Sequence, residues 1–511
     1  MKKRLIRNRK VRYGGISVIL TVLVITVTVL TNAVFSSLAT RYSWYKYMNP
    51  AANYDVTDDC YALLDDLFAD HAATKTEIIF CNTEANVQAD DTQGYLYHTA
   101  RSLAERYPQN IKLTFYDIVT NPNTVRPYTT TLNPVTGETV ETKLASTNVI
   151  IVNGDYHRVY ELTEFFVFKD GNTANLWAYN GEKKLAAGIL HAVEENPPIA
   201  CLTNNHGEVF YDYEMVYLLD DAGYSVRFID LYKEEIPEGC ELIISYNPNT
   251  DMMEKGTLSQ TSEAEKLDAF LSVAGNNFLV LLENGTPKLP NFEAYLKQWG
   301  VKFSYDPQGE RSYRYMLQDS ANSLTSDGYT VYGAPMESGH SQTLLTGLSD
   351  KVVFKNATAF ENSRGFISNG DGSYTAGNRT LYSLYTGSNS AVCWANGLPV
   401  ADGNDSILMS VTEQKGEGGS SYVGVVASVD FSSEEFLQSA VYENTDVMMR
   451  LFGIFGKEYT PEGLTIKPFA SQDISTITTR QMLWWTIGLA LTPTVIVTAT
   501  AVVVLIKRRR A

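Results

Sequence analysis

Two long apolar runs, one near each end of the chain, constrain this sequence more than any other feature. Residues 14–40 form an uncharged, mostly apolar run that follows a tail with seven Lys and Arg and no acid. A second apolar run, residues 483–506, ends at Lys507 and three arginines. About 20 helical residues cross the hydrocarbon core of a bilayer, and basic flanks favour the cytoplasmic side. The sequence therefore predicts two flanking transmembrane helices, two cytoplasmic termini and a large extracytoplasmic domain at the cell (plasma) membrane.

The charge of the region between these tails limits its partners. The net charge of the chain is −17, and the tails carry seven and four positive charges, which leaves −28 for residues 13–506. An acidic domain of this kind is unsuited to nucleic acid and to anionic lipid headgroups, and it permits cationic partners. Solubility alone also accounts for the acidic balance. We therefore expect no nucleic-acid partner.

The first part of the central region has the pattern of an α/β domain. A strand, a helix, a strand, a hairpin and a helix follow an acidic, aromatic segment at 41–73. These elements are expected at 77–81, 95–107, 111–118, 148–162 and 185–193. Their order predicts a thioredoxin-like domain over residues 74–198. Cys81 stands near the place of that fold's first redox cysteine, but no second cysteine accompanies it.

Strands and helices alternate again over residues 199–304 and 422–456. The strands there read as continuous apolar runs, which is typical of a parallel sheet covered on both faces. Residues 305–421 differ, because Gly, Ser, Asn, Thr and Tyr dominate, and they predict a β-rich insertion. Residues 457–482 are expected to form a polar stalk.

Polar residues stand where strands of this second unit end. In an open parallel sheet, ligands bind at the carboxyl ends of the strands. The candidate ligand- or partner-binding residues at these positions are Asn205, His206, Gly207, Glu208, Asn247, Glu283 and Asp430. His206 and Glu208 also suit a metal pair or a general acid–base pair. A turn at Gly207, with Asn205 capping a helix, is equally compatible with these residues.

Motifs of common catalytic and cofactor sites are missing from the sequence. It has no G-x-S-x-G, no Walker A loop, no G-x-G-x-x-G after a strand, no H-E-x-x-H and no C-x-x-C. We therefore expect a protein that is not an enzyme, with no ATPase of its own, no cofactor and no metal.

Several segments resemble a known family. Residues 201–208 resemble that family's first strand and its GHGE-type loop, with Asn205 where glycine is usual. The segments 223–248, 262–282, 425–431 and 444–455 resemble its later strands and helices, including a closing strand, a D-F pair and a helix. In this order the motifs resemble the GldG-like ABC-transporter auxiliary proteins, first associated with gliding motility.

The resemblance implies a membrane-anchored, extracytoplasmic accessory subunit that binds a substrate or partner beside a separate ABC permease and cytoplasmic ATPase. It also implies a flavodoxin-like fold in the second unit, similar to class I glutamine amidotransferases but without their nucleophilic cysteine. Two other hypotheses stay open. One is an extracytoplasmic hydrolase that uses His206, Glu208 and Asp430, and the other is a surface scaffold or adhesion protein that uses the β-rich insertion.

Overall fold

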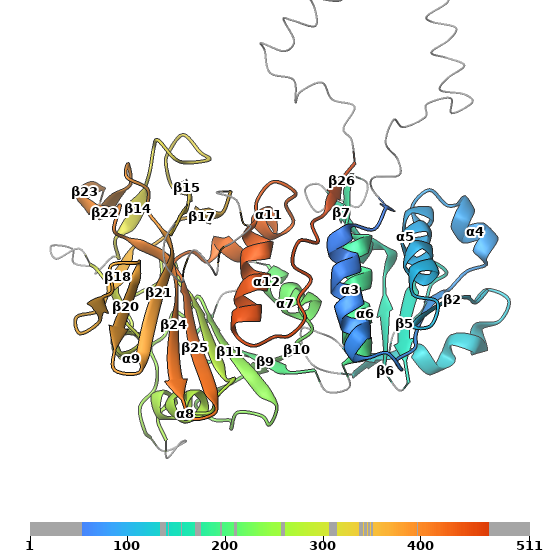
Figure 1. Ribbon diagram of the computed structural model, residues 1–511, viewed down its shortest axis with the longest axis horizontal. Coiled ribbons are helices and arrows are strands. Elements are labelled where there is room, and N and C mark those ends of the chain that lie inside the picture. Colours follow the sequence, from blue (N-terminus) through green and yellow to red (C-terminus); the bar gives the residue numbers. More distant parts are fainter. Residues whose placement is uncertain are drawn as a thin grey trace, which may run out of the picture. The chain divides into compact units, whose positions relative to one another are not determined.

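The computed structural model describes most of the chain between residues 54 and 469 (Figure 1). The described ranges are 54–132, 139–141, 143–154, 156–168, 175–194, 197–208, 212–256, 261–305, 314–336, 351–395 and 397–469, with Ser341, Leu345 and Leu348. One compact unit extends to Lys467, and a second covers Pro468–Ala511. Within the first unit, we call residues 54–194 the N-terminal half and residues 197–467 the C-terminal half.

The N-terminal half contains a four-stranded mixed sheet of order β2-β1-β5-β6. Its strands are β1 (Thr76–Phe80), β2 (Ile111–Phe115), β5 (Val149–Asn153) and β6 (Tyr156–Tyr160). Strands β1 and β2 are parallel, whereas β5 is antiparallel to both β1 and β6. The helices of this half are α3 (Asp58–Asp70), α4 (Glu84–Ala89), α5 (Gln93–Arg106) and α6 (Gly181–Val193).

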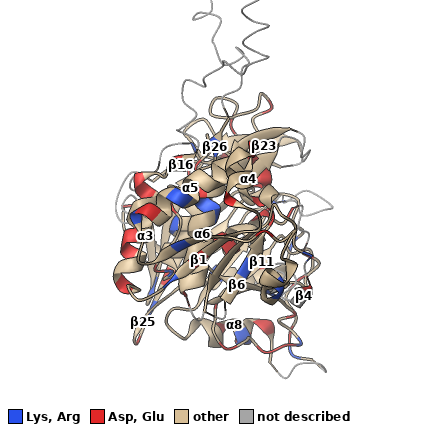
Figure 2. Cartoon of the chain, turned by 90° about the vertical axis from the view of Figure 1, so that its right-hand side faces the viewer, with Lys and Arg blue, Asp and Glu red and all other residues tan. Residues whose placement is uncertain are grey.

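Helix α3 has one apolar face, which is buried, and one acidic face, which is exposed. Its buried residues are Cys60, Leu64, Leu67 and Phe68, at the spacing of one helical face. The aspartates of this helix are all exposed, and Figure 2 marks the acidic residues along α3 in red. The hydroxyl of Thr57 caps the helix by accepting a hydrogen bond from the Cys60 backbone nitrogen.

Helix α6 is buried along its whole length. It lies very close to the sheet at Gly188, where a Cβ atom would be 2.4 Å from Cδ1 of Ile151 and 2.7 Å from the Tyr160 hydroxyl. Only glycine permits this approach without displacing neighbouring atoms. The helix nevertheless carries Lys183 and Lys184, which need partners because an unpaired buried charge is strongly destabilising.

Short elements complete the N-terminal half. They are η2 (Pro122–Tyr128), β3 (Thr130–Leu132), β4 (Thr139–Glu141), η3 (Leu162–Phe165), β7 (Phe166–Phe168) and β8 (Leu176–Tyr179). Strands β7 and β8 form an antiparallel pair directly before α6.

A twelve-stranded mixed sheet forms the C-terminal half. Its parallel part has the order β10-β9-β11-β12-β25. These strands are β9 (Ile199–Thr203), β10 (Ser225–Ile229), β11 (Cys240–Tyr246), β12 (Asn277–Leu281) and β25 (Gly419–Val426). The helices are α7 (Glu214–Asp221), α8 (Glu263–Leu271), α9 (Pro290–Gln298), α11 (Glu434–Leu437) and α12 (Asn444–Ile454). All five residues of β12 are buried, as the apolar runs predict for a covered sheet.

The remaining elements of the C-terminal region are short strands and one 3-10 turn. They are β13 (Val301–Phe303), β14 (Met316–Gln318), β15 (Thr330–Tyr332), β16 (Ala334–Pro335), β17 (Val353–Lys355), β18 (Phe360–Asn362), β19 (Ile367–Ser368), β20 (Ser373–Ala376), β22 (Val392–Ala395), β23 (Leu398–Asp402), η5 (Asp430–Ser432) and β26 (Lys467–Pro468).

Part of the predicted β-rich insertion continues the main sheet, whereas β14, β22 and β23 form a separate three-stranded sheet and β15 and β17 a two-stranded one. Strands β24 (Ile407–Gly416) and β21 (Arg379–Thr386) continue the sheet beyond β25, and both pairings are antiparallel (Figure 1). Strands β24 and β25 form a hairpin, so the backbone groups on that side of β25 are hydrogen-bonded instead of forming an open edge. The predicted flavodoxin-like parallel-sheet domain with a β-rich insertion is therefore wrong, because the sheet is mixed and several of its strands come from residues 305–421.

The predicted fold class needs a second correction. Across the described ranges, no helix combines the length and apolar character needed to cross a bilayer. The predicted runs at 14–40 and 483–506 lie outside these ranges. A sheet-rich unit with several mixed sheets thus replaces the predicted thioredoxin-like and flavodoxin-like pair between two transmembrane helices. The two-pass localisation that depended on those helices is corrected with it.

Buried ion pairs join the two halves. Arg158 on β6 pairs with Asp220 on α7, and both side chains are largely buried. On α6, Nζ of Lys184 lies 2.6 Å from Oδ1 of Asp221, which is the next residue of α7. Burial alone would raise the pKa of Asp220, but Arg158 and His191 outweigh this effect and the pKa is lowered. Helix α7 thus supplies the counter-charges that a buried α6 requires.

We expect Asp220→Asn to lower the free energy of unfolding by about 3–5 kcal/mol, because it leaves the Arg158 charge buried without its partner. The control is Glu105→Gln, which removes an exposed pair with Arg101 and should change stability by less than about 0.5 kcal/mol. Urea denaturation of both variants measures the difference. Equal, small effects would show that the buried pair does not hold the halves together.

Candidate functional site

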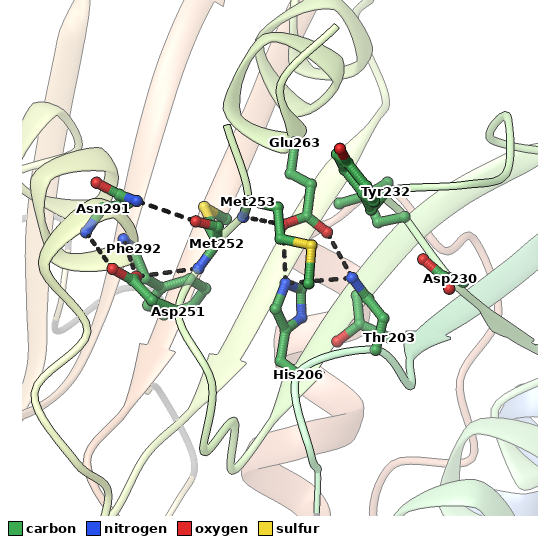
Figure 3. A network of polar contacts seen from close by, with 12 residues as sticks. Thr203, His206, Asp230, Tyr232, Asp251, Met252, Met253, Glu263, Asn291 and Phe292 are labelled. Atoms are coloured by element: carbon green, nitrogen blue, oxygen red, sulfur yellow. Dashed lines mark hydrogen bonds and ion pairs between the residues drawn. The ribbon is translucent and has the colours of Figure 1, made fainter. Parts of the chain in front are cut away.

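The loop that follows β9 contains four of the predicted candidates. His206 is buried in this loop, and its ring lies between two carboxylates. Nδ1 is 3.2 Å from Oε1 of Glu208. Nε2 is 3.0 Å from Oε2 of Glu263 (Figure 3). We call His206, Glu208 and Glu263 the histidine clamp.

Local geometry explains why Glu208 folds back onto His206. Gly207 has a φ of +67°, a left-handed conformation that turns the chain sharply. The Glu208 side chain then accepts a hydrogen bond from the His206 backbone nitrogen at 2.8 Å and another from the Thr203 hydroxyl at 2.6 Å. The expected turn at Gly207 is therefore confirmed.

Glu263 is the member of the clamp that the sequence analysis missed. It is the first residue of α8, directly after Ser262, whose hydroxyl caps the helix in a capping box with Glu265. Its carboxylate accepts hydrogen bonds from the Met253 backbone nitrogen and from Nδ2 of Asn205, each at 2.6 Å. Asn205 therefore binds Glu263 and does not cap the helix that follows its own loop.

The clamp changes the protonation of all three side chains. Burial acts to lower the pKa of His206, but hydrogen bonds to Glu208 and Glu263 outweigh it and raise the pKa to about 9. Burial acts to raise the pKa of each glutamate, yet the hydrogen bond from His206 leads the opposing effects and both pKa values are lowered. At neutral pH an imidazolium therefore lies between two carboxylates.

The loops after β11 and β12 hold the next two candidates, Asn247 and Glu283. Nδ2 of Asn247 is 3.4 Å from Oε1 of Glu283, and the Asn247 side chain also accepts a hydrogen bond from Thr286 at 3.1 Å. The backbone oxygen of His206 accepts hydrogen bonds from the amides of Asn249 and Thr250, so the loops after β9 and β11 lie side by side. The structure thus gathers most predicted candidates at one edge of the sheet.

The loop after β11 also fixes the start of another helix. The carboxylate of Asp251 accepts hydrogen bonds from the backbone nitrogens of Asn291 and Phe292, each at 2.9 Å, at the beginning of α9 (Figure 3). One loop therefore ties the first turns of α8 and α9 to the end of the sheet, through Met253 and Asp251.

Asp430 has a different environment. It begins η5 and accepts a hydrogen bond from Nδ2 of Asn356 at 3.0 Å. Both ring nitrogens of His206 lie within hydrogen-bond distance of Glu208 and Glu263, so neither is available to Asp430. A protonated histidine held on both sides has no free nitrogen to act as a base. Among the described residues, no group of three or more His, Cys, Asp or Glu is placed to hold a metal ion.

A cavity of about 500 Å³ lies at the junction of the two halves, and we call it the junction cavity. Its walls come from the η3–β7 segment and α6 in the N-terminal half, and from α7 and α11 in the C-terminal half. It shares no lining residue with the predicted candidates at the sheet edge. Small-molecule sites are typically cavities of about 300–1,000 Å³ between structural units.

Charged residues of the junction cavity were not predicted. Glu214 and Glu164 lie in its wall, together with Lys183 and Lys184. Burial is the main cause that raises the pKa of Glu214 to about 7, and it also raises the pKa of Glu164. Sequence reasoning looked only at the carboxyl ends of strands, whereas these residues lie on helices and turns.

Comparisons with known proteins place the chain in no family. No family model and no curated protein matches it. Among solved structures it is similar to PurLQS from Thermotoga maritima, with 14% identity and a TM-score of 0.24, over 50% of this chain and 99% of that one. A likeness this distant carries no argument about the function of this chain.

The clamp predicts how stability depends on pH. Because the pKa of His206 is higher in the folded protein than in the unfolded chain, its stabilisation is complete below about pH 6.5 and is lost as pH rises through about 9. We expect a loss of up to about 3 kcal/mol, since one pKa unit corresponds to about 1.4 kcal/mol. Urea denaturation from pH 6 to pH 9.5 measures it.

The matched control replaces the clamp as a unit, with His206→Gln, Glu208→Gln and Glu263→Gln together. This variant keeps other titrating groups, so the difference between the two pH profiles isolates the clamp. Parallel profiles for the two proteins would contradict a buried imidazolium between the glutamates.

Proposed function

We propose that this protein is a binding subunit and not an enzyme. It would hold a small molecule in the junction cavity and act as an accessory subunit of an ABC-type transport system, beside a separate permease and ATPase. The observation that carries the binding role is the junction cavity, whose walls come from both halves and include buried, titratable side chains. The transport context rests on the resemblance of residues 201–208 and the later segments to the GldG-like auxiliary proteins.

The state of the histidine clamp favours binding over hydrolysis. A hydrolase based on His206 needs a neutral imidazole with a free nitrogen near the substrate. Here His206 is buried, and its pKa is raised to about 9 by the flanking glutamates. The clamp therefore ties the loop after β9 to the first turn of α8, and its role is to hold the sheet edge in place.

Purification of the tagged full-length chain in mild detergent tests the accessory role. We expect a polytopic permease and an ATPase to co-purify in near-stoichiometric amounts, identified by mass spectrometry. The clamp variant His206→Gln, compared at equal amounts of folded protein, should retain both partners, because the clamp is structural.

Two results would count against this function. Recovery of the chain without a permease and an ATPase would remove the transport context. Loss of a measurable hydrolytic activity on His206→Gln, in a protein with unchanged folded fraction, would support the hydrolase hypothesis instead.

A further inference from the structure

We propose that the junction cavity binds an organic cation, in which an ammonium group is attached to an apolar body. This assignment rests on the proposed binding function and specifies its ligand class. It follows from the charge, the apolar surface and the aromatic side chains of the cavity wall.

The charges of the cavity wall do not balance. The wall contains five carboxylates and only two lysines. Asp221 lies within ion-pair distance of both lysines, since its carboxylate is 2.6 Å from Nζ of Lys184 and 3.7 Å from Nζ of Lys183. The other four carboxylates belong to Glu161, Glu164, Glu214 and Glu434. Across the described part of the chain, no Lys or Arg lies within ion-pair distance of these four, so the cavity favours a positive ligand.

Carboxylates alone would indicate only a solvated acidic surface. The same wall, however, contains Phe166, Phe168, Leu218, Leu437 and Ile466, which supply an apolar surface. Tyr217 also lines the cavity and is 40% exposed. Burial of a hydrocarbon body against these side chains is favourable, and an aromatic ring attracts a cation placed over its face. The wall therefore suits a molecule with one charged end and one apolar end.

Glu214 is the carboxylate that a cation would affect most. The groups that act on it come from three segments: Asp212 precedes α7, Glu434 lies on α11, and Lys183 and Lys184 lie on α6. Burial, Asp212 and Glu434 favour its neutral form and outweigh the hydrogen bond from Gln438 and the charge of Lys184, so the pKa is raised to about 7. A bound ammonium group would favour the ionised carboxylate, so binding should release a proton near neutral pH.

The test uses three probes of similar shape and different charge on the full-length protein: phenethylammonium, the neutral phenethyl alcohol and the anionic hydrocinnamate. Isothermal titration calorimetry at pH 8 should show phenethylammonium binding at least about tenfold more tightly than either of the other two. Between pH 8 and pH 6 its affinity should fall by about tenfold, as Glu214 takes up its proton.

Variants identify the group responsible. Glu214→Gln should weaken binding of phenethylammonium by about tenfold and remove the pH dependence. Glu434→Gln is the second variant. Glu434 is exposed, so this change should leave folding intact. Glu417→Gln, at an exposed position between β24 and β25, is the matched control and should leave the affinity unchanged.

Four results would each overturn the ligand class. They are equal binding of the alcohol, tighter binding of hydrocinnamate, no binding of any probe, and unchanged affinity in Glu214→Gln. The outcome is separate from that of the proposed accessory role. If a permease and an ATPase co-purify but phenethylammonium does not bind, the ligand class is wrong and the accessory role stands. If it binds but no transporter subunit co-purifies, the cavity assignment stands and the transport context falls.

Discussion

The pairing of buried charges between α6 and α7 is the constraint on which the arrangement of the two halves depends. Helix α6 is buried along its whole length, yet it carries Lys183 and Lys184. An unpaired charge in such a position costs several kcal/mol. Asp221 at the end of α7 lies within ion-pair distance of both lysines, and the adjacent Asp220 pairs with Arg158 on β6. Helix α6 can therefore be buried only when the C-terminal half lies against it, and the junction cavity forms beside this contact.

Local patterns predicted the elements well and their long-range partners poorly. The strand expected at 77–81 corresponds to β1 (Thr76–Phe80), and the helix expected at 95–107 corresponds to α5 (Gln93–Arg106). The pairing of β24 with β25 and β21 could not be read in the same way. Alternation of polar and apolar residues indicates that a strand exists, but any of several strands could satisfy its backbone hydrogen bonds. The Gly- and Ser-rich composition of 305–421 therefore suggested a β-rich insertion but did not reveal that several of its strands continue the main sheet.

The candidate site was also predicted only in part, because local patterns do not reveal contacts between residues far apart in the sequence. The position of His206 and Glu208 after a parallel strand was readable, because the carboxyl ends of such strands meet at one edge. Glu263 was not, since it lies 57 residues away on another element and looks like an ordinary acidic residue in a first helical turn. Without it, His206 looked like a possible base, whereas with it the ring is a buried cation between two carboxylates.

Buried carboxylates occur in both the clamp and the junction cavity. Their pKa values shift in opposite directions, and this difference distinguishes a structural role from a binding role. In the clamp, His206 provides the compensating charge, and the pKa values of Glu208 and Glu263 are lowered. In the cavity, burial is the leading influence, and the pKa values of Glu164 and Glu214 are raised. A group whose charge is already compensated contributes to the stability of the fold and has little to gain from a ligand. A buried carboxylate without a compensating charge can gain interaction free energy when a cation binds beside it. For this reason we place the ligand in the cavity and not at His206.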